Sequence, residues 1–131
     1  MKFFYVLAIV TMLASCSGKP IYNIEKAYVP TPVSGEQLTI KQVESAILSG
    51  AMRKGWSPRV ISPGLIEAHI TVRSHMAAVE IAFTESYYSI TYKDSRNLKY
   101  DKGKIHGNYN RWIHKLSGAI QKQFGVRTQN F

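Results

Sequence analysis

The chain has 131 residues, enough for one domain of ordinary size and too few for two. Hydrophobic residues make up 45% of the sequence and charged residues 19%, which is typical of a globular protein and excludes a chain that is disordered throughout. The formal net charge of +9 favours anionic partners such as phosphate-bearing headgroups, acidic glycans or nucleic acid.

The first 15 residues have the pattern of a secretory signal peptide. Met1 and Lys2 give a positive start, and an almost wholly apolar stretch runs from Phe3 to Ala14. Twelve helical residues extend about 18 Å, which is short of the roughly 30 Å of a bilayer's hydrocarbon core. A cleaved signal peptide is therefore a better interpretation than a permanent transmembrane helix.

The segment Leu13-Ala14-Ser15-Cys16 resembles the lipobox of bacterial lipoproteins, in which an aliphatic residue and two small residues precede a cysteine. The resemblance implies cleavage before Cys16 and fatty chains such as palmitate on its thiol. Ser17 in place of Asp implies sorting to the outer membrane, with the protein facing the periplasm. Cys16 is the single cysteine, which excludes an intramolecular disulfide. One alternative is an ordinary signal peptide with an incidental cysteine near its cleavage site. The other is a buried N-terminal helix.

Residues 16–36 contain several Pro and Gly residues and few apolar residues in any regular period. This composition predicts a flexible tether that follows the lipidated cysteine and lifts the folded part from the bilayer. A short edge strand formed by Ile21, Tyr22 and Ile24 is the alternative. The predicted division is a signal peptide over 1–15, the tether over 16–36, one α+β domain over 37–125 and a C-terminal tail over 126–131.

The first helix is predicted from Thr39 to Lys54. Thr39 and Gln42 have the spacing of a capping box, which satisfies two free backbone donors. Gly55 follows at the position where a left-handed residue ends a helix. Apolar residues recur at helical spacing and predict one buried face, formed by Ile40, Val43, Ile47 and Ala51.

Alternating apolar and polar residues from Trp56 to Lys93 predict a four-stranded antiparallel meander. The connections are expected at Ser62-Pro63-Gly64, at Ser74-His75 and at Glu85-Ser86. In this register the apolar residues of the last three strands share one face, whereas a slip of one residue would expose all of them. The expected pairs are Val60–Ile66 and Trp56–Ile70, then Val72–Ala77, Ile70–Val79, Ala68–Ile81 and Ile66–Phe83, and finally Phe83–Tyr88, Ile81–Ile90 and Val79–Tyr92.

The other face of this sheet is predicted to be polar. His69 lies opposite Glu80 in the expected register, which indicates either an acid/base pair or a polar contact between strands. His75 is expected in a turn. The predicted polar face carries Glu67, His69, Thr71, Arg73, Glu80, Thr91 and Lys93.

A second amphipathic helix is predicted near the C-terminus, ending at Gly125. Its apolar positions at helical spacing are Tyr109, Trp112, Ile113, Leu116, Ile120 and Phe124. The predicted order is α-β-β-β-β-α. Two apolar helix stripes and one apolar sheet face then favour an α+β two-layer sandwich with both helices on one face of the sheet.

The segment after Lys93 has no regular period for about 15 residues and is rich in cations. Seven Lys and Arg residues against two Asp residues give a net charge of +5 from Lys93 to Lys115, with Tyr, Trp and Asn residues interleaved. Such a surface is suited to a phosphorylated or glycan ligand, although a solvated basic surface and contact with anionic headgroups are alternatives. The candidate ligand surface is Lys93, Arg96, Asn97, Lys99, Tyr100, Lys102, Lys104, His106, Arg111 and Lys115.

We therefore expect a non-enzymatic, lipid-anchored envelope protein that binds a partner protein, an anionic lipid or a glycan such as peptidoglycan or lipopolysaccharide. No cofactor or metal is expected, because the eight-residue spacing of His106 and His114 does not match that of a zinc-binding helix. A small hydrolase of envelope polymers, with His106, Asp94 or Asp101 as acid/base groups, is the alternative. Nucleic acid is the expected partner only if the protein is not exported.

Overall fold

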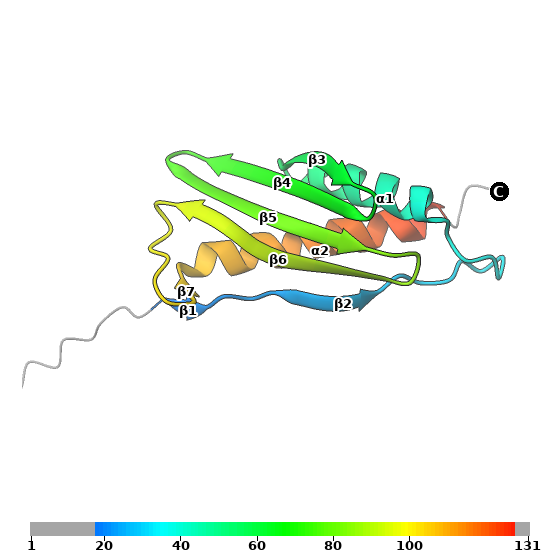
Figure 1. Ribbon diagram of the computed structural model, residues 1–131, viewed down its shortest axis with the longest axis horizontal. Helices are drawn as coiled ribbons and strands as arrows, with labels where there is room; N and C mark the ends of the chain where they lie inside the picture. Colours follow the sequence, from blue (N-terminus) through cyan, green and yellow to red (C-terminus); the bar gives the residue numbers. More distant parts are fainter. Residues whose placement is uncertain (1–17, 128–131) are drawn as a thin grey trace, which may run out of the picture.

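In the computed structural model, residues 18–127 form an antiparallel sheet and two helices that cover one of its faces (Figure 1). The predicted signal peptide, Cys16 and residues 128–131 lie outside the described residues. The elements in chain order are β1 (Lys19–Pro20), β2 (Ile24–Tyr28), α1 (Ile40–Arg53), β3 (Ser57–Ser62), β4 (Leu65–Val72), β5 (His75–Phe83), β6 (Tyr87–Arg96), β7 (Lys104–Ile105) and α2 (Gly107–Arg127).

The main sheet has five strands in the order β2-β6-β5-β4-β3, and β1 pairs with β7 in a separate small sheet. The predicted meander corresponds to β3 to β6. The prediction of four strands and of the order α-β-β-β-β-α is wrong because β2 adds a fifth strand. In β2, Ile24 pairs with Ile90 and Ala27 pairs with Tyr88, with an irregularity between the two pairs. The edge-strand alternative is confirmed only in part: an edge strand is present, but of Ile21, Tyr22 and Ile24 it includes only Ile24.

The segment interpreted as a tether packs against the domain from Gly18 onward. Asn110 fixes it to α2, because its side-chain nitrogen donates to the carbonyl of Pro20 and its oxygen accepts from the backbone of Tyr22, both at 3.0 Å. The Tyr22 ring stacks on His114 with 4.2 Å between centroids. The prediction of a flexible tether is wrong for these residues.

Two of the three predicted strand registers agree with the structure. Val60 lies opposite Ile66, and the β5–β6 pairs are those expected. The β3–β4 ladder begins at Ser57 opposite His69, so it does not include the expected Trp56–Ile70 pair. The β6 strand also extends to Arg96, so part of the segment predicted to be irregular after Lys93 is regular.

The predicted register between β4 and β5 is wrong by two residues. Val72 pairs with His75, so the connection is Arg73 and Ser74 and His75 belongs to β5. Arg73 adopts a φ of +56°, the left-handed conformation that such a short connection requires. The observed pairs are Ile66–Ile81, Ala68–Val79 and Ile70–Ala77.

The helices agree with most of the sequence expectations. Gln42 donates its backbone N–H to the Thr39 hydroxyl at 3.2 Å, and its side chain accepts from the Thr39 backbone at 2.9 Å, which confirms the capping box. Gly55 is left-handed with a φ of +83°. Ile40, expected in the buried face, is 41% exposed. The α2 helix continues past Gly125, so this glycine does not end it and the predicted tail over 126–131 begins inside the helix.

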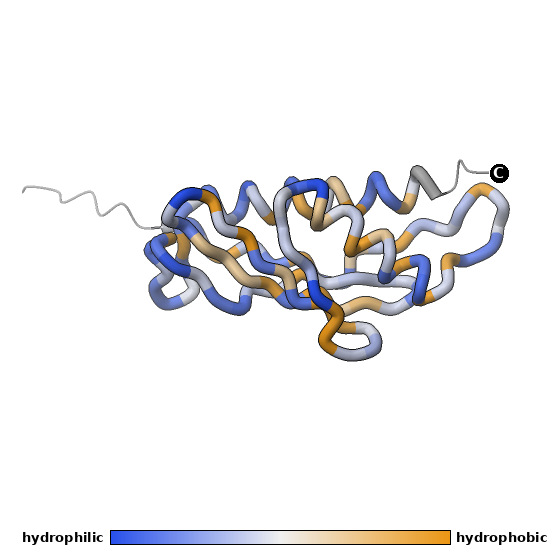
Figure 2. Tube along the Cα trace, turned by 90° about the horizontal axis from the view of Figure 1, so that it is seen from above, coloured by the Kyte–Doolittle hydropathy of each residue, from blue (hydrophilic) through white to orange (hydrophobic). Residues whose placement is uncertain are grey.

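The core lies between the sheet and the two helices, and hydrophobic positions recur along both layers (Figure 2). The helices approach most closely at Gly50 of α1, where an added Cβ would lie 2.8 Å from the Cα of Ile120 in α2. Fully buried members of the core include Val43, Ile47, Ile66, Val79, Ile81, Ile90, Ile113, Leu116, Ile120 and Phe124.

Candidate ligand site

The loop from residue 97 to residue 103 connects β6 to β7 and holds an unusual backbone. Asn97, Lys99 and Lys102 adopt φ values of +57°, +54° and +47°. Residues other than Gly, Asn and Asp avoid this conformation at a cost of about 1–2 kcal/mol each, so surrounding contacts must hold Lys99 and Lys102 in it. Leu98 supplies one such contact, because its side chain is buried and its carbonyl accepts from the backbone of His106 at 2.8 Å. The backbone that carries the loop's lysines and Tyr100 is therefore held in place.

The end of β6 and this loop enclose an open cleft of about 600 Å³. We call it the tyrosine cleft, and its walls include Tyr92, Lys93, Asp94, Asn97, Lys99 and Tyr100. The rings of Tyr92 and Tyr100 stack with 4.7 Å between centroids and 14° between planes, and Tyr109 packs edge-on against Tyr92. Tyr100 is 49% exposed, so Tyr92 covers one of its faces and the rest of the ring meets solvent.

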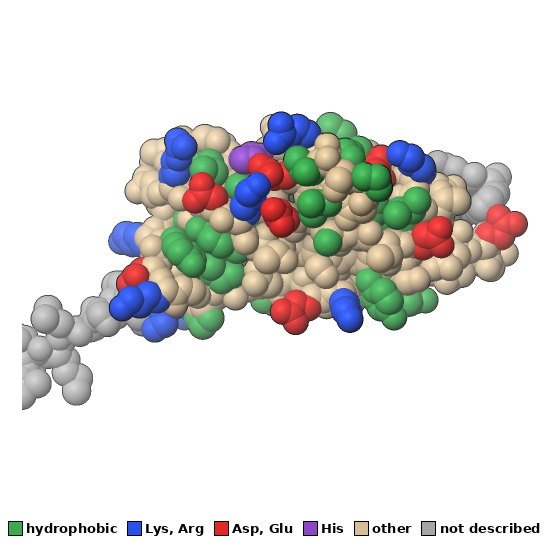
Figure 3. Space-filling view, viewed as in Figure 1, with side chains coloured by type: hydrophobic (Ala, Val, Ile, Leu, Met, Phe, Trp, Pro, Cys, Tyr) green, Lys and Arg blue, Asp and Glu red, His purple; other side chains and the backbone are tan. Residues whose placement is uncertain are grey.

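A second cavity of about 540 Å³ lies beside the first. We call it the lysine pocket, and its walls include Gly18, Lys19, Lys99, Asp101, Lys104 and His106. Lys99 lines both cavities. Lys19, Lys99 and Lys104 make no ion pair with another described side chain. Figure 3 shows basic side chains beside a hydrophobic patch at the end of the molecule where the described chain begins.

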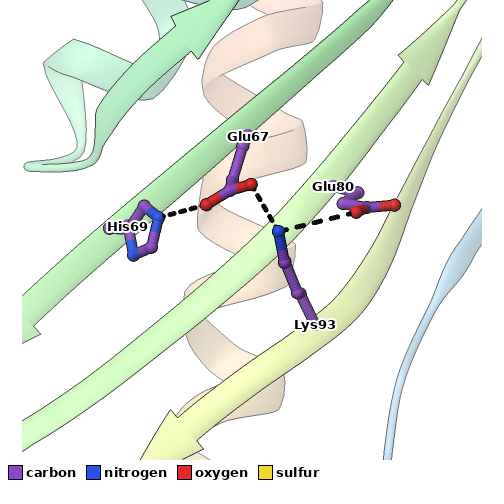
Figure 4. A network of polar contacts seen from close by, with 4 residues as sticks. All are labelled: Glu67, His69, Glu80 and Lys93. Carbon is purple, nitrogen blue, oxygen red and sulfur yellow. Dashed lines mark hydrogen bonds and ion pairs between the residues drawn. The ribbon is translucent and has the colours of Figure 1, made fainter. Parts of the chain in front are cut away.

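A network of charged groups lies on the sheet face that the helices leave open (Figure 4). Glu67 accepts from the Lys93 ammonium at 2.5 Å and from His69 Nε2 at 2.6 Å, and Lys93 lies 3.8 Å from Glu80. The hydrogen bond from Lys93, followed by that from His69, holds the pKa of Glu67 below its usual value. The same bond to Glu67 raises the pKa of Lys93. The positive charge of Lys93 is therefore balanced by Glu67 within the protein.

The predicted pairing of His69 with Glu80 across two strands is wrong. His69 lies opposite Ala78, and Glu80 lies opposite Glu67. The cause is the two-residue error in the β4–β5 register, which left each side chain on the correct face and changed its neighbour. His69 instead bonds to Glu67 on its own strand.

The three acid/base candidates are divided between the two cavities. Asp101 and His106 face the lysine pocket, whereas Asp94 faces the tyrosine cleft. His106 also caps α2, since its Nδ1 accepts from the backbone of Asn108 at 3.1 Å and its carbonyl accepts from Tyr109 at 3.0 Å.

The predicted ligand surface is only partly brought together. Lys93, Asn97, Lys99 and Tyr100 meet in the tyrosine cleft, and Lys104 and His106 join Lys99 at the lysine pocket. The other four predicted residues line neither cavity: Arg96 and Lys102 are exposed, Arg111 donates to the Asn108 side chain, and Lys115 is exposed on α2.

Two residues at these cavities depend on long-range contacts, and a third residue, Tyr109, is buried behind Tyr92. Asn97 donates its side-chain amide to the Ser74 hydroxyl at 2.8 Å, so this group stabilises the loop. Lys19, which the sequence analysis did not single out, reaches the lysine pocket because β1 pairs with β7. The Tyr109 hydroxyl is buried with no hydrogen-bond partner among the described residues, and burial raises its pKa.

Comparison with protein-family models, with curated proteins and with solved structures gave no match. No helix between residues 18 and 127 is long and apolar enough to cross a bilayer. In the same part of the chain, no group of three or more His, Cys, Asp and Glu side chains is placed to hold a metal ion.

Proposed function

We propose that this protein is a lipid-anchored envelope protein that binds a saccharide in the tyrosine cleft and catalyses no reaction. The stacked pair of Tyr92 and Tyr100 is the observation that carries the proposal. An exposed, pre-oriented aromatic ring offers a flat surface for the apolar face of a sugar, at little cost in conformational entropy. Asp94 and the backbone groups of the fixed loop lie beside it and offer hydrogen-bond partners for hydroxyl groups.

The proposed anchor would hold this cleft at the membrane surface. Two peptide units join Cys16 to Gly18, and because an extended residue covers at most about 3.6 Å, their Cα atoms lie within about 7 Å. Gly18 lines the lysine pocket, next to the tyrosine cleft. Two or three acyl chains, at about 0.8 kcal/mol per buried methylene, would make the attachment firm. The ligand would then be a saccharide of the outer-membrane surface or of the adjacent peptidoglycan.

Titration of the purified full-length protein in detergent tests saccharide binding. The probes are a soluble oligosaccharide derived from lipopolysaccharide and a soluble peptidoglycan fragment. We expect one of them to bind and Tyr100→Ala to weaken binding about tenfold, equivalent to about 1.4 kcal/mol of lost stacking. Tyr28→Ala is the matched control, because Tyr28 is 60% exposed and lies on β2 outside both cavities.

Two results would reject saccharide binding. One is equal affinity of the Tyr100→Ala and wild-type proteins for the bound probe. The other is the absence of binding to either probe while a specific envelope protein is recovered with the wild type, which would favour a protein partner.

Metabolic labelling with a radioactive fatty acid tests the anchor separately. We expect label on the wild-type protein and none on Cys16→Ala. Absence of label on the wild-type protein, or its presence on Cys16→Ala, would exclude lipidation at Cys16. Either result would leave the saccharide titration unaffected.

A further inference from the structure

We infer that the lysine pocket binds a phosphate group, so that the ligand is a phosphorylated saccharide with its sugar in the tyrosine cleft. The inference rests on the proposed function and specifies its ligand. It starts from the common wall of the two cavities: Lys99 lines both, and Tyr100 follows it directly in the chain. One ligand can therefore contact the Tyr100 ring and the lysine pocket together.

The charge of the lysine pocket suits a phosphate monoester. Three ammonium groups, from Lys19, Lys99 and Lys104, line it together with the single carboxylate of Asp101. None of these four groups makes an ion pair with another described side chain. The net charge of +2 matches the charge of −1.5 to −2 that a phosphate monoester carries near neutral pH.

Backbone contacts between distant parts of the chain hold the main chain of two of the three lysines. Lys19 lies opposite Ile105, and Ile21 donates its N–H to the carbonyl of Gly103 at 2.9 Å. Lys104 donates its backbone N–H to Asp101 and accepts one in return, both at 2.9 Å. Because the backbone that carries these lysines is already in place, a bound anion would have to order only their side chains.

The tyrosine cleft differs in charge from the lysine pocket. Lys93, the other cation in its wall, is bound to Glu67 at 2.5 Å. The wall also carries Asp94 and the shared Lys99, which make no ion pair with another described side chain but have opposite charges, so the charges of this lining sum to about zero and suit an uncharged part of the ligand. The separation of a neutral aromatic cleft from a cationic pocket is the pattern expected for a sugar with a phosphate at one end.

The size of the lysine pocket also fits this ligand class. Its volume of about 540 Å³ lies within the range of roughly 300–1,000 Å³ found for small-molecule sites. The pocket is therefore large enough for a phosphate together with its attached sugar carbon atoms.

Titration of the full-length protein in detergent with glucose, glucose 1-phosphate and inorganic phosphate tests the inference. We expect glucose 1-phosphate to bind at least about tenfold more tightly than glucose, because charge-assisted hydrogen bonds contribute more than neutral ones. The double variant Lys19→Gln with Lys104→Gln is expected to remove this preference and to leave the affinity for glucose unchanged.

The matched control is the double variant Lys102→Gln with Lys115→Gln, which removes the same charge from exposed positions outside both cavities. It is expected to keep the preference for the phosphorylated sugar. An equal loss in both double variants would overturn the inference, because the attraction would then be a property of the whole basic surface.

Two further titrations distinguish a phosphorylated saccharide from other sources of phosphate. Binding to glycerol 3-phosphate, a soluble phospholipid headgroup fragment, or to inorganic phosphate, that equals binding to glucose 1-phosphate and survives Tyr100→Ala would overturn the inference in favour of a simple phosphate or phospholipid site. Equal affinity for glucose and glucose 1-phosphate would overturn the phosphate site alone. Absence of binding to every sugar would overturn the proposed function as well.

Discussion

Glu67 is the one charged residue buried among the residues whose side chains the structure describes, with 9% of its surface exposed. A carboxylate is kept charged in such a place only when partners replace its water. Lys93 and His69 do so at 2.5 and 2.6 Å. At the scale of residues, this network fixes the end of β6 that forms the wall of the tyrosine cleft.

The network makes stability depend on pH in a defined direction. The pKa of Glu67 in the folded protein lies below its ordinary value of 4.5. The stability that the charged Glu67 contributes is therefore fully present above pH 4.5 and is lost as pH falls through the folded pKa. We expect the stability difference between wild type and Glu67→Gln to shrink when urea unfolding is measured at about pH 6, 4 and 3.

Glu80→Gln is the matched control, because this carboxylate lies 3.8 Å from Lys93 and is 46% exposed on its side chain. Its removal is expected to change the pH dependence less than Glu67→Gln does. A constant difference between wild type and Glu67→Gln over the same pH range would contradict the assigned role of Glu67.

Part of the candidate site could be predicted from composition alone. The excess of cations and tyrosines after Lys93 pointed to Lys99, Tyr100 and Lys104, all of which line a cavity. Lys19 could not be found in this way, because its place depends on a pairing with Ile105 that no local pattern specifies. The role of Asn97 in holding the loop was also hidden, since its partner Ser74 belongs to a different hairpin.

At the scale of elements, the errors have a common physical cause. Hydrophobic alternation fixes which face a side chain occupies, but a slip of two residues preserves that face. The predicted register of β4 and β5 was wrong by two residues, because the left-handed residue of the turn is Arg73 and no glycine indicates the position of this turn in the sequence. The sequence analysis favoured a tether over the short strand β2, because only two of its five residues, Ile24 and Ala27, are partly buried and they do not alternate regularly.

The packing of the two helices gives a prediction with a built-in control. Gly50→Ala would place a methyl group 2.8 Å from backbone atoms of Ile120, whereas Gly118→Ala in α2 meets nothing within 4 Å. Overpacking costs about 1–3 kcal/mol and alanine gains about 1 kcal/mol over glycine in a helix. We expect Gly50→Ala to lower the free energy of unfolding by up to about 2 kcal/mol.

Gly118→Ala is expected to raise the free energy of unfolding by about 0.5–1 kcal/mol in the same urea titration. Equal effects of the two substitutions would contradict the close approach of α1 and α2 at Gly50. The helix periodicity predicted both helices but not this contact, since it depends on how they cross.

At the scale of the whole molecule, the described chain begins at one end of the long axis and α2 ends at the other (Figures 1 and 2). Both cavities lie at the first end, where Gly18 contacts the backbone of Ile105. The predicted long tether would have allowed any orientation at the membrane. With the domain packed from Gly18 onward, a lipid on Cys16 would leave the molecule little freedom and would turn the cavities toward the headgroups.

Amine footprinting tests most directly the central proposal, that a lipid anchor on Cys16 turns the cavities toward the membrane. Full-length protein inserted from outside into vesicles would be modified with an impermeant amine reagent, and each lysine would be quantified by mass spectrometry. Lys122 lies about 22 Å along α2 from Gly107, at 1.5 Å per residue, and serves as the distal reference. We predict that Lys19, Lys99 and Lys104 are protected several-fold relative to Lys122, and that Cys16→Ala removes this protection. Equal modification of all four lysines in the vesicle-bound wild type would contradict the account.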